Sequence, residues 1–176
     1  MFGYTELEYA MKFRMLIVMD EKNTSQMDQY AENFKNIIES YSRMLIHHPR
    51  LALPEENGMQ PEEVRANTKT LEEICTGGNI GLVLRQNCFS QNLLFTLLVE
   101  AIYRTIILVH YYAPEGELLA AILKETYCGK KERTDIQLCR TLYVSRTTFY
   151  RRKQQAILFA GYLFYEAVLP EMEGKI

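Results

Sequence analysis

The stretch from Leu93 to Tyr112 constrains this sequence more than any other feature, because it is apolar on nearly every side of a helical projection. Glu100 and Arg104 interrupt it four residues apart, in the order that favours an ion pair along one helical face. With its charges paired in this way, the stretch fits a buried helix better than a membrane span. We therefore expect a central helix that other helices must cover, and no association with a membrane.

Most of the other periodic segments also have the helical period. A capping box at Thr5 opens a predicted helix that runs to about Met19. The proline-rich segment 49–61 is predicted to be a loop, and a helix is expected from Pro61 to Cys75. Ser90 is placed to cap the central helix. One amphipathic face is formed at helical spacing by Tyr30, Phe34, Ile37, Ile38, Tyr41 and Leu45. The sequence therefore predicts an all-α fold.

The cysteines and histidines do not spell a metal site. No C-x-x-C pair occurs, and the neighbouring His47 and His48 lack a matching pattern of cysteine or carboxylate ligands. Glu6 and Glu8 precede any apolar run, so the N-terminus does not resemble a secretory signal. We expect a cytoplasmic protein with reduced thiols and no bound metal.

Motifs of enzymes are also missing from the sequence. Neither G-x-S-x-G nor H-E-x-x-H occurs, and the glycine-rich segment 77–81 lacks the Lys-Ser/Thr pair of a phosphate-binding loop. Serine, histidine and aspartate are present, but no spacing places them together for catalysis. We therefore expect a protein that is not an enzyme and that uses no cofactor.

The net charge of −2 conceals an uneven distribution. The window from Gly129 to Lys153 holds eight basic and two acidic residues and carries +6, whereas the remainder, with 12 basic and 20 acidic residues, carries −8. Such a window is often only a solvated face. Its apolar pattern decides between that interpretation and a binding surface for a polyanion.

Two helices and a short turn are predicted within and beyond this window. Asp135 to Leu142 is expected to be a short helix, Tyr143 to Ser145 a turn with Ser145 as N-cap, and Arg146 the start of a helix that extends to about Val168. On the second helix, the polar residues Thr147, Tyr150, Arg151 and Gln154 fall within about 100° of one another. The opposite side carries the apolar residues Phe149, Ala156, Ala160 and Leu163.

Cationic residues occupy the flanks between these two faces, at Arg146, Arg152 and Lys153. A helix in the major groove needs this three-way division, because its front contacts base edges, its flanks contact phosphates and its back packs on its own domain. A solvated helix face has no such requirement.

The pattern Leu138-Cys139-x-x-Leu142-Tyr143-Val144-Ser145-Arg146-x-x-Phe149 resembles a helix-turn-helix signature. Its apolar residues, including Leu138, Val144 and Phe149, stand at the packing positions of that motif. Cys139 occupies the place of a small residue, commonly alanine, and Tyr143 the place of a glycine in many members. If Tyr143 must adopt a positive φ, it costs on the order of 1 kcal/mol.

The C-terminal arrangement as a whole resembles the sigma-factor region-four-like domain of phage transcriptional regulators of the ArpU and RinA type. This resemblance implies a C-terminal three-helix helix-turn-helix domain over residues 115–170. The helical periodicity of residues 1–112 predicts an acidic N-terminal helical bundle. The segment 118–123 would form the supporting first helix. The implied function is sequence-specific binding of double-stranded DNA in transcription regulation, in a protein of phage or mobile-element origin.

The helix-turn-helix interpretation assigns roles to two sets of polar residues. Contacts with bases or the groove are expected from Thr147, Tyr150, Arg151 and Gln154, with Arg151 placed to read guanine. Contacts with phosphates are expected from Arg146, Arg152, Lys153, Lys130, Lys131 and Arg133. The alternative for each is a solvent-exposed side chain on an ordinary helix.

Other functions remain open at the level of sequence. The basic C-terminal helices would also suit an interaction module that contacts RNA polymerase or another protein, or an accessory protein of DNA packaging or recombination. Residues 1–112 could provide a helical core, a homodimer interface, a docking site or a tyrosine-rich groove for a small effector. A helical core is the most economical of these roles for residues 1–112.

Overall fold

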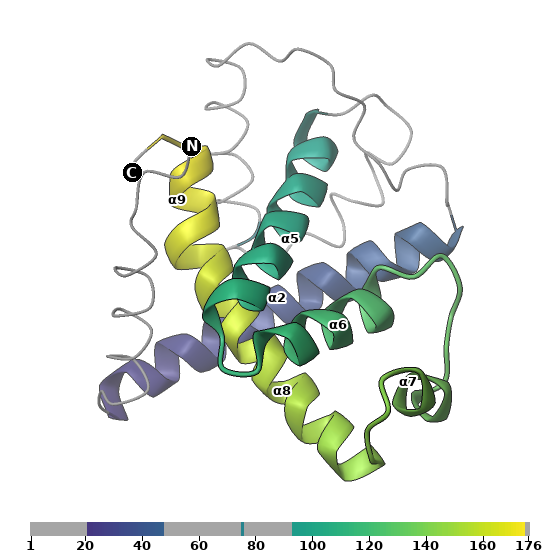
Figure 1. The fold of residues 1–176 in the computed structure, drawn as a ribbon. Coiled ribbons are helices and arrows are strands. Elements are labelled where there is room, and N and C mark those ends of the chain that lie inside the picture. Colours follow the sequence, from purple (N-terminus) through teal and green to yellow (C-terminus); the bar gives the residue numbers. More distant parts are fainter. Residues whose placement is uncertain (1–20, 48–74, 76–92, 175–176) are drawn as a thin grey trace.

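Helices make up every regular element of the residues that the structure describes (Figure 1). The computed structural model describes residues 21–47, 75 and 93–174. The elements are α2 (Glu21–His47), α5 (Leu93–Tyr112), α6 (Gly116–Tyr127), α7 (Asp135–Thr141), α8 (Arg146–Leu163), the π-helix η2 (Phe164–Val168) and α9 (Leu169–Met172). The prediction of an all-α fold is confirmed for these residues. The predicted helix 5–19, the loop 49–61, the cap at Ser90 and all but Cys75 of the helix 61–75 lie outside them.

The amphipathic face predicted on α2 is buried in the fold. Phe34, Ile38, Tyr41 and Leu45 have no exposed surface, and Ile37 is 1% exposed. Their spacing at three and four residues places them on one side of the helix, where each adds to the hydrophobic core.

Tyr30, at the edge of this face, is half-buried and stacks on Tyr165 with ring centroids 4.7 Å apart. Its hydroxyl donates to Glu166 at 2.8 Å. Aromatic stacking and the hydrogen bond together fix α2 against η2.

The apolar helix α5 is mostly buried but leaves one side open. Ile102, Ile106 and Val109 are completely buried, whereas Ile107 is 48% and Tyr111 72% exposed. The helix therefore contributes to the core, as expected of a central helix, and leaves Ile107 and Tyr111 on an uncovered side.

The ion pair predicted between Glu100 and Arg104 is present on α5, with 2.5 Å between the carboxylate oxygen and the guanidinium nitrogen. Arg104 also lies 3.7 Å from Glu171 in α9. No helix of the described residues is both long enough and apolar enough to cross a membrane.

Helix α8 crosses α2 at very close range (Figure 1). The crossing depends on Gly161, because a Cβ atom there would lie 2.7 Å from the carbonyl carbon and oxygen of Tyr30. Glycine removes this clash and allows the two backbones to approach. The first turns of α8 and all of α7 extend beyond the crossing, at the end of the molecule opposite α9 (Figure 1).

Two clusters of buried side chains hold the helices together. The larger cluster includes residues of α2, α5, α6, α8 and η2, and so draws on both sides of the predicted boundary near residue 113. The smaller consists of Ile122, Leu138, Cys139 and Phe149 and joins α6, α7 and α8. The division into domains 1–112 and 115–170 stays a prediction.

The long C-terminal helix changes its hydrogen bonding near its end. The N–H of Leu169 donates to the carbonyl of Phe164, five residues back, in place of the usual four. Pro170 follows directly, and its ring would crowd the carbonyl of Glu166 in a regular helix. The wider turn lets the helical path continue through the proline.

Candidate nucleic-acid interface

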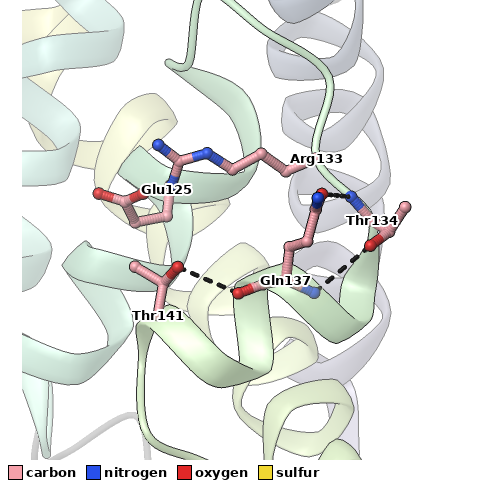
Figure 2. Close-up of polar contacts among 5 residues, drawn as sticks. All are labelled: Glu125, Arg133, Thr134, Gln137 and Thr141. Carbon is pink, nitrogen blue, oxygen red and sulfur yellow. Dashed lines mark hydrogen bonds and ion pairs between the residues drawn. The ribbon is translucent and has the colours of Figure 1, made fainter.

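Helix α7 begins at a complete capping box. The hydroxyl of Thr134 accepts a hydrogen bond from the N–H of Gln137 at 3.4 Å, and the side chain of Gln137 accepts one from the N–H of Thr134 at 2.9 Å (Figure 2). Two backbone donors at the helix start are thereby satisfied. This cap stabilises a helix that, at seven residues, is too short to be stable alone.

The turn between α7 and α8 is tight and strained at one residue. The N–H of Val144 donates to the carbonyl of Cys139 at 3.0 Å, and Tyr143 has a φ of 54°. Tyr143 therefore adopts the left-handed conformation, which glycine reaches without strain and a residue with a side chain does not. Its side chain is 96% exposed and gains no buried contact in return.

Ser145 begins α8 as predicted. Its φ of −69° and ψ of 157° are extended, and its hydroxyl accepts a hydrogen bond from the N–H of Thr148 at 3.2 Å. The buried side chains of Leu138 and Phe149 then hold α7 and α8 against α6 through the smaller cluster. The packing roles predicted for these two residues and for the partly buried Val144 are confirmed.

The predicted front of α8 faces solvent. Thr147, Tyr150, Arg151 and Gln154 are all exposed, while Phe149 on the back has no exposed surface. Tyr150 is 43% exposed, and its hydroxyl donates a hydrogen bond to the carboxylate of Asp135 in α7. The structure thus brings the predicted front residues together on one accessible face.

Some of the predicted phosphate contacts are engaged within the protein. Arg152 forms an ion pair with Glu115, before α6, and donates to Gln155 at 2.8 Å. Arg133, in the loop before α7, forms an ion pair with Glu125 near the end of α6 (Figure 2). These contacts fix both guanidinium groups against neighbouring elements. Their contact with phosphate stays a prediction.

Lys153 points its ammonium over two aromatic rings, 5.4 Å from the centroid of Tyr127 and 5.8 Å from that of Phe149. Burial raises the pKa of Tyr127, and the carboxylates of Glu39 and Asp135 raise it further. The phenol therefore stays neutral, and the ammonium interacts with a π face.

A second set of cations points into solvent without such contacts. Arg146 and Arg151 on α8 and Lys130 and Lys131 in the loop are exposed, and none pairs with a carboxylate of the described residues. Arg140 on α7 belongs with them, although the sequence did not assign it a role. Its place in the basic window is the signal in the sequence that marks Arg140 as a candidate, because a helical projection of α8 does not include residues of α7.

An open groove of about 700 Å³ lies between α8 and α2. Arg151 and Gln154 line it on the side of α8, whereas Asp28, Glu32 and Glu39 line it on the side of α2. The sequence did not predict that these acids would stand beside the front of α8. They weaken the attraction of a polyanion to this side of the helix.

The described residues contain no group of three or more His, Cys, Asp or Glu side chains arranged to hold a metal ion. No protein-family model, curated protein or solved structure matches this chain. Its function is therefore inferred from geometry and charge.

Proposed function

We propose that this protein is a sequence-specific transcriptional regulator that binds double-stranded DNA in the cytoplasm of its host cell. In this proposal α6, α7 and α8 form a helix-turn-helix unit of the phage-regulator type, and α8 enters the major groove. The observation that carries the proposal is the division of α8 into an exposed polar front and a buried apolar back. It is a binding function and involves no catalytic step.

The exposed residues of α8 suit different parts of a duplex. Arg151 presents an exposed guanidinium, without an ion pair to any described residue, that matches the O6 and N7 acceptors of guanine. Thr147 and Gln154 flank it with shorter polar groups. Arg146, at the first turn of α8, and the two loop lysines Lys130 and Lys131 are the accessible candidates for phosphate contacts.

The two arginines that form ion pairs within the protein, Arg133 and Arg152, position the helices of the proposed DNA-binding surface. Arg152 connects α8 to the start of α6, and Arg133 connects the loop before α7 to the end of α6. Preorganised helices lose less conformational freedom when they bind. We assign these two residues first to positioning α7 and α8, with any phosphate contact added to that role.

Selection of bound fragments from a random duplex library tests the proposal directly. The full chain is expected to enrich a defined sequence, and the spacing of any repeated half-sites would report a dimer. Affinity for the enriched site should fall with salt, with a log–log slope of about −3 or steeper if Arg146, Lys130 and Lys131 each neutralise a phosphate. Absence of any gel shift at low salt would overturn the proposal.

A further inference from the structure

A second open cavity, of about 570 Å³, lies at the turn between α7 and α8. Its lining comes from α7, from the turn and from the first residue of α8: Ile136, Cys139, Arg140, Tyr143, Val144 and Arg146. None of these residues belongs to α2, so the cavity is separate from the groove between α2 and α8.

The apolar part of this cavity is unusually accessible. Ile136 is 49% and Tyr143 96% exposed, and both are among the few large apolar side chains exposed in the described part of the chain. Cys139 and Val144 complete the apolar surface between them. Neighbouring exposed apolar side chains of this kind are typical of a surface that another molecule covers.

The charge of the cavity has one sign. Arg140 and Arg146 line it, both exposed and without an ion pair among the described residues, and no carboxylate of those residues contributes to the lining. The groove beside α2 differs, because it holds Asp28 and Glu32 close to its own cations. An occupant complementary to the cavity must therefore combine negative charge with an apolar group.

The cavity also lies away from the side of α8 that carries Arg151. At 100° per residue, Arg146 and Arg151 are about 140° apart around the helix. A molecule seated beside Arg146 and Arg140 therefore approaches α8 from a different direction than a duplex read by Arg151. A phosphate backbone would satisfy the two arginines but would leave Ile136 and Tyr143 uncovered.

We propose that this cavity docks an acidic segment of a partner protein, with one aliphatic or aromatic side chain of the segment seated between Ile136 and Tyr143. Carboxylates on either side of that anchor pair with Arg140 and Arg146. A buried apolar anchor surrounded by charge pairs is a common arrangement for a tight contact with a short segment. The protein would thereby contact a second protein through the cavity of α7 and the turn, and DNA through the side of α8 that carries Arg151, with Arg146 lying between the two surfaces.

Fluorescence anisotropy with the full chain tests this docking. The probe is a short labelled synthetic peptide in which Leu and Phe are flanked by Asp and Glu. Two control peptides have the same length: one carries Lys for every acid, and the other carries Ala for both Leu and Phe. The acidic apolar peptide is expected to bind, and each control to bind at least about tenfold more weakly. Equal binding of the lysine peptide would overturn the proposal.

Variants of the chain locate the peptide. Arg140→Glu and Ile136→Ser are each expected to weaken binding of the acidic peptide by about tenfold or more. Lys124→Glu is the matched control, because it reverses an exposed charge on α6 outside the cavity. Circular dichroism and thermal melting establish that each variant is folded, and Arg140→Ala replaces Arg140→Glu if the reversal unfolds the chain.

Three further outcomes decide whether the acidic segment docks in this cavity. Unchanged peptide affinity in folded Ile136→Ser and Arg140→Ala chains would place the peptide elsewhere and overturn the proposal. Sedimentation analysis that showed a dimer dissociated by Ile136→Ser would assign the cavity to a second copy and also overturn it. Retention of duplex binding by Ile136→Ser, together with loss of the peptide, would support separate docking sides.

Discussion

The hydroxyl of Tyr150 in α8 donates a hydrogen bond to the carboxylate of Asp135 at the start of α7. The bond joins two helices that otherwise meet through the turn and the smaller apolar cluster. It also occupies the polar atom of a residue on the exposed front of α8. Tyr150 can therefore contact a duplex through the edge and face of its ring.

Replacing Tyr150 by Phe separates the contribution of the hydroxyl from that of the ring. Loss of the hydrogen bond to Asp135 is expected to lower the free energy of unfolding by about 1 kcal/mol, because the acceptor carries a charge but is not fully buried. Affinity for the selected duplex should change little in Tyr150→Phe and fall clearly in Tyr150→Ala. Urea unfolding and gel-shift titration measure the two effects. Equal loss of affinity in both variants would mean that the hydroxyl itself contacts DNA.

Arg151 and Arg152 are neighbours in sequence with different surroundings, and they make a matched pair. Arg151→Ala removes an exposed guanidinium that pairs with no carboxylate in the described part of the chain, so affinity for the selected duplex should fall roughly 5- to 150-fold, and preference for guanine at one position should weaken. The stability of the fold should change by less than about 0.5 kcal/mol.

Arg152→Ala should instead lower the stability of the fold and leave the sequence preference of DNA binding unchanged. Its guanidinium bonds to Glu115 and Gln155, and its side chain is only 20% exposed. Removal is expected to lower the free energy of unfolding by about 1 kcal/mol, and to lower duplex affinity equally for all sequences. Binding titrations on matched and mismatched duplexes distinguish the two variants. A greater loss of sequence preference in Arg152→Ala would contradict the assignment of Arg151 as the base reader.

The acids on α2 should restrain DNA binding. Asp28 and Glu32 line the groove beside Arg151, so a phosphate backbone placed against α8 would meet their charge. Asp28→Asn and Glu32→Gln are each expected to raise duplex affinity about twofold at low salt, and the gain should shrink as salt is added. Glu171→Gln removes the same charge in α9, at the opposite end of the molecule, and should leave affinity unchanged (Figure 1).

The helical period predicted the features that depend on a single helix. The buried face of α2 around Phe34 and Tyr41, the cap at Ser145 and the exposed front of α8 all follow from local spacing. The same period placed Arg152 and Lys153 on flanks of α8, yet each turns toward partners on other segments.

These partners could not be predicted, because their positions depend on how the helices pack. Glu115 is 37 residues from Arg152, and Asp28 and Glu32 approach α8 only through the crossing at Gly161. A helical projection reports the direction of a side chain around its own axis. It carries no information about which segment lies opposite.

Tyr143 and Glu115 are the non-glycine residues of the described chain with positive φ, at 54° and 55°. Tyr143→Gly is expected to raise the free energy of unfolding by about 1 kcal/mol, because glycine adopts this conformation without strain and the lost ring was almost wholly exposed. Glu115→Gly relieves the same backbone strain but loses the ion pair with Arg152, so its gain should be smaller. Urea unfolding of both variants gives the comparison. A less stable Tyr143→Gly chain would show that the ring stabilises the turn.

Three phenols and one thiol that are buried or partly buried should make the fold sensitive to alkali. Burial raises the pKa of Cys128 to about 12, and it also raises the pKa values of Tyr41, Tyr127 and Tyr165 above their ordinary range. Above about pH 9, the unfolded chain therefore loses protons that the folded chain still holds. The stability from these groups is complete below that pH and is lost progressively as pH rises toward and beyond 12.

Tyr127→Phe tests this dependence at a single group. The hydroxyl of Tyr127 is buried without a hydrogen-bond partner among the described residues, so its removal should leave stability unchanged or slightly raised at neutral pH. The ring that Lys153 contacts is kept. Urea unfolding across neutral to alkaline pH should show a shallower decline for Tyr127→Phe than for the parent chain, because one group that titrates late is gone. Parallel declines in the two chains would show that Tyr127 ionises equally in the folded and unfolded states.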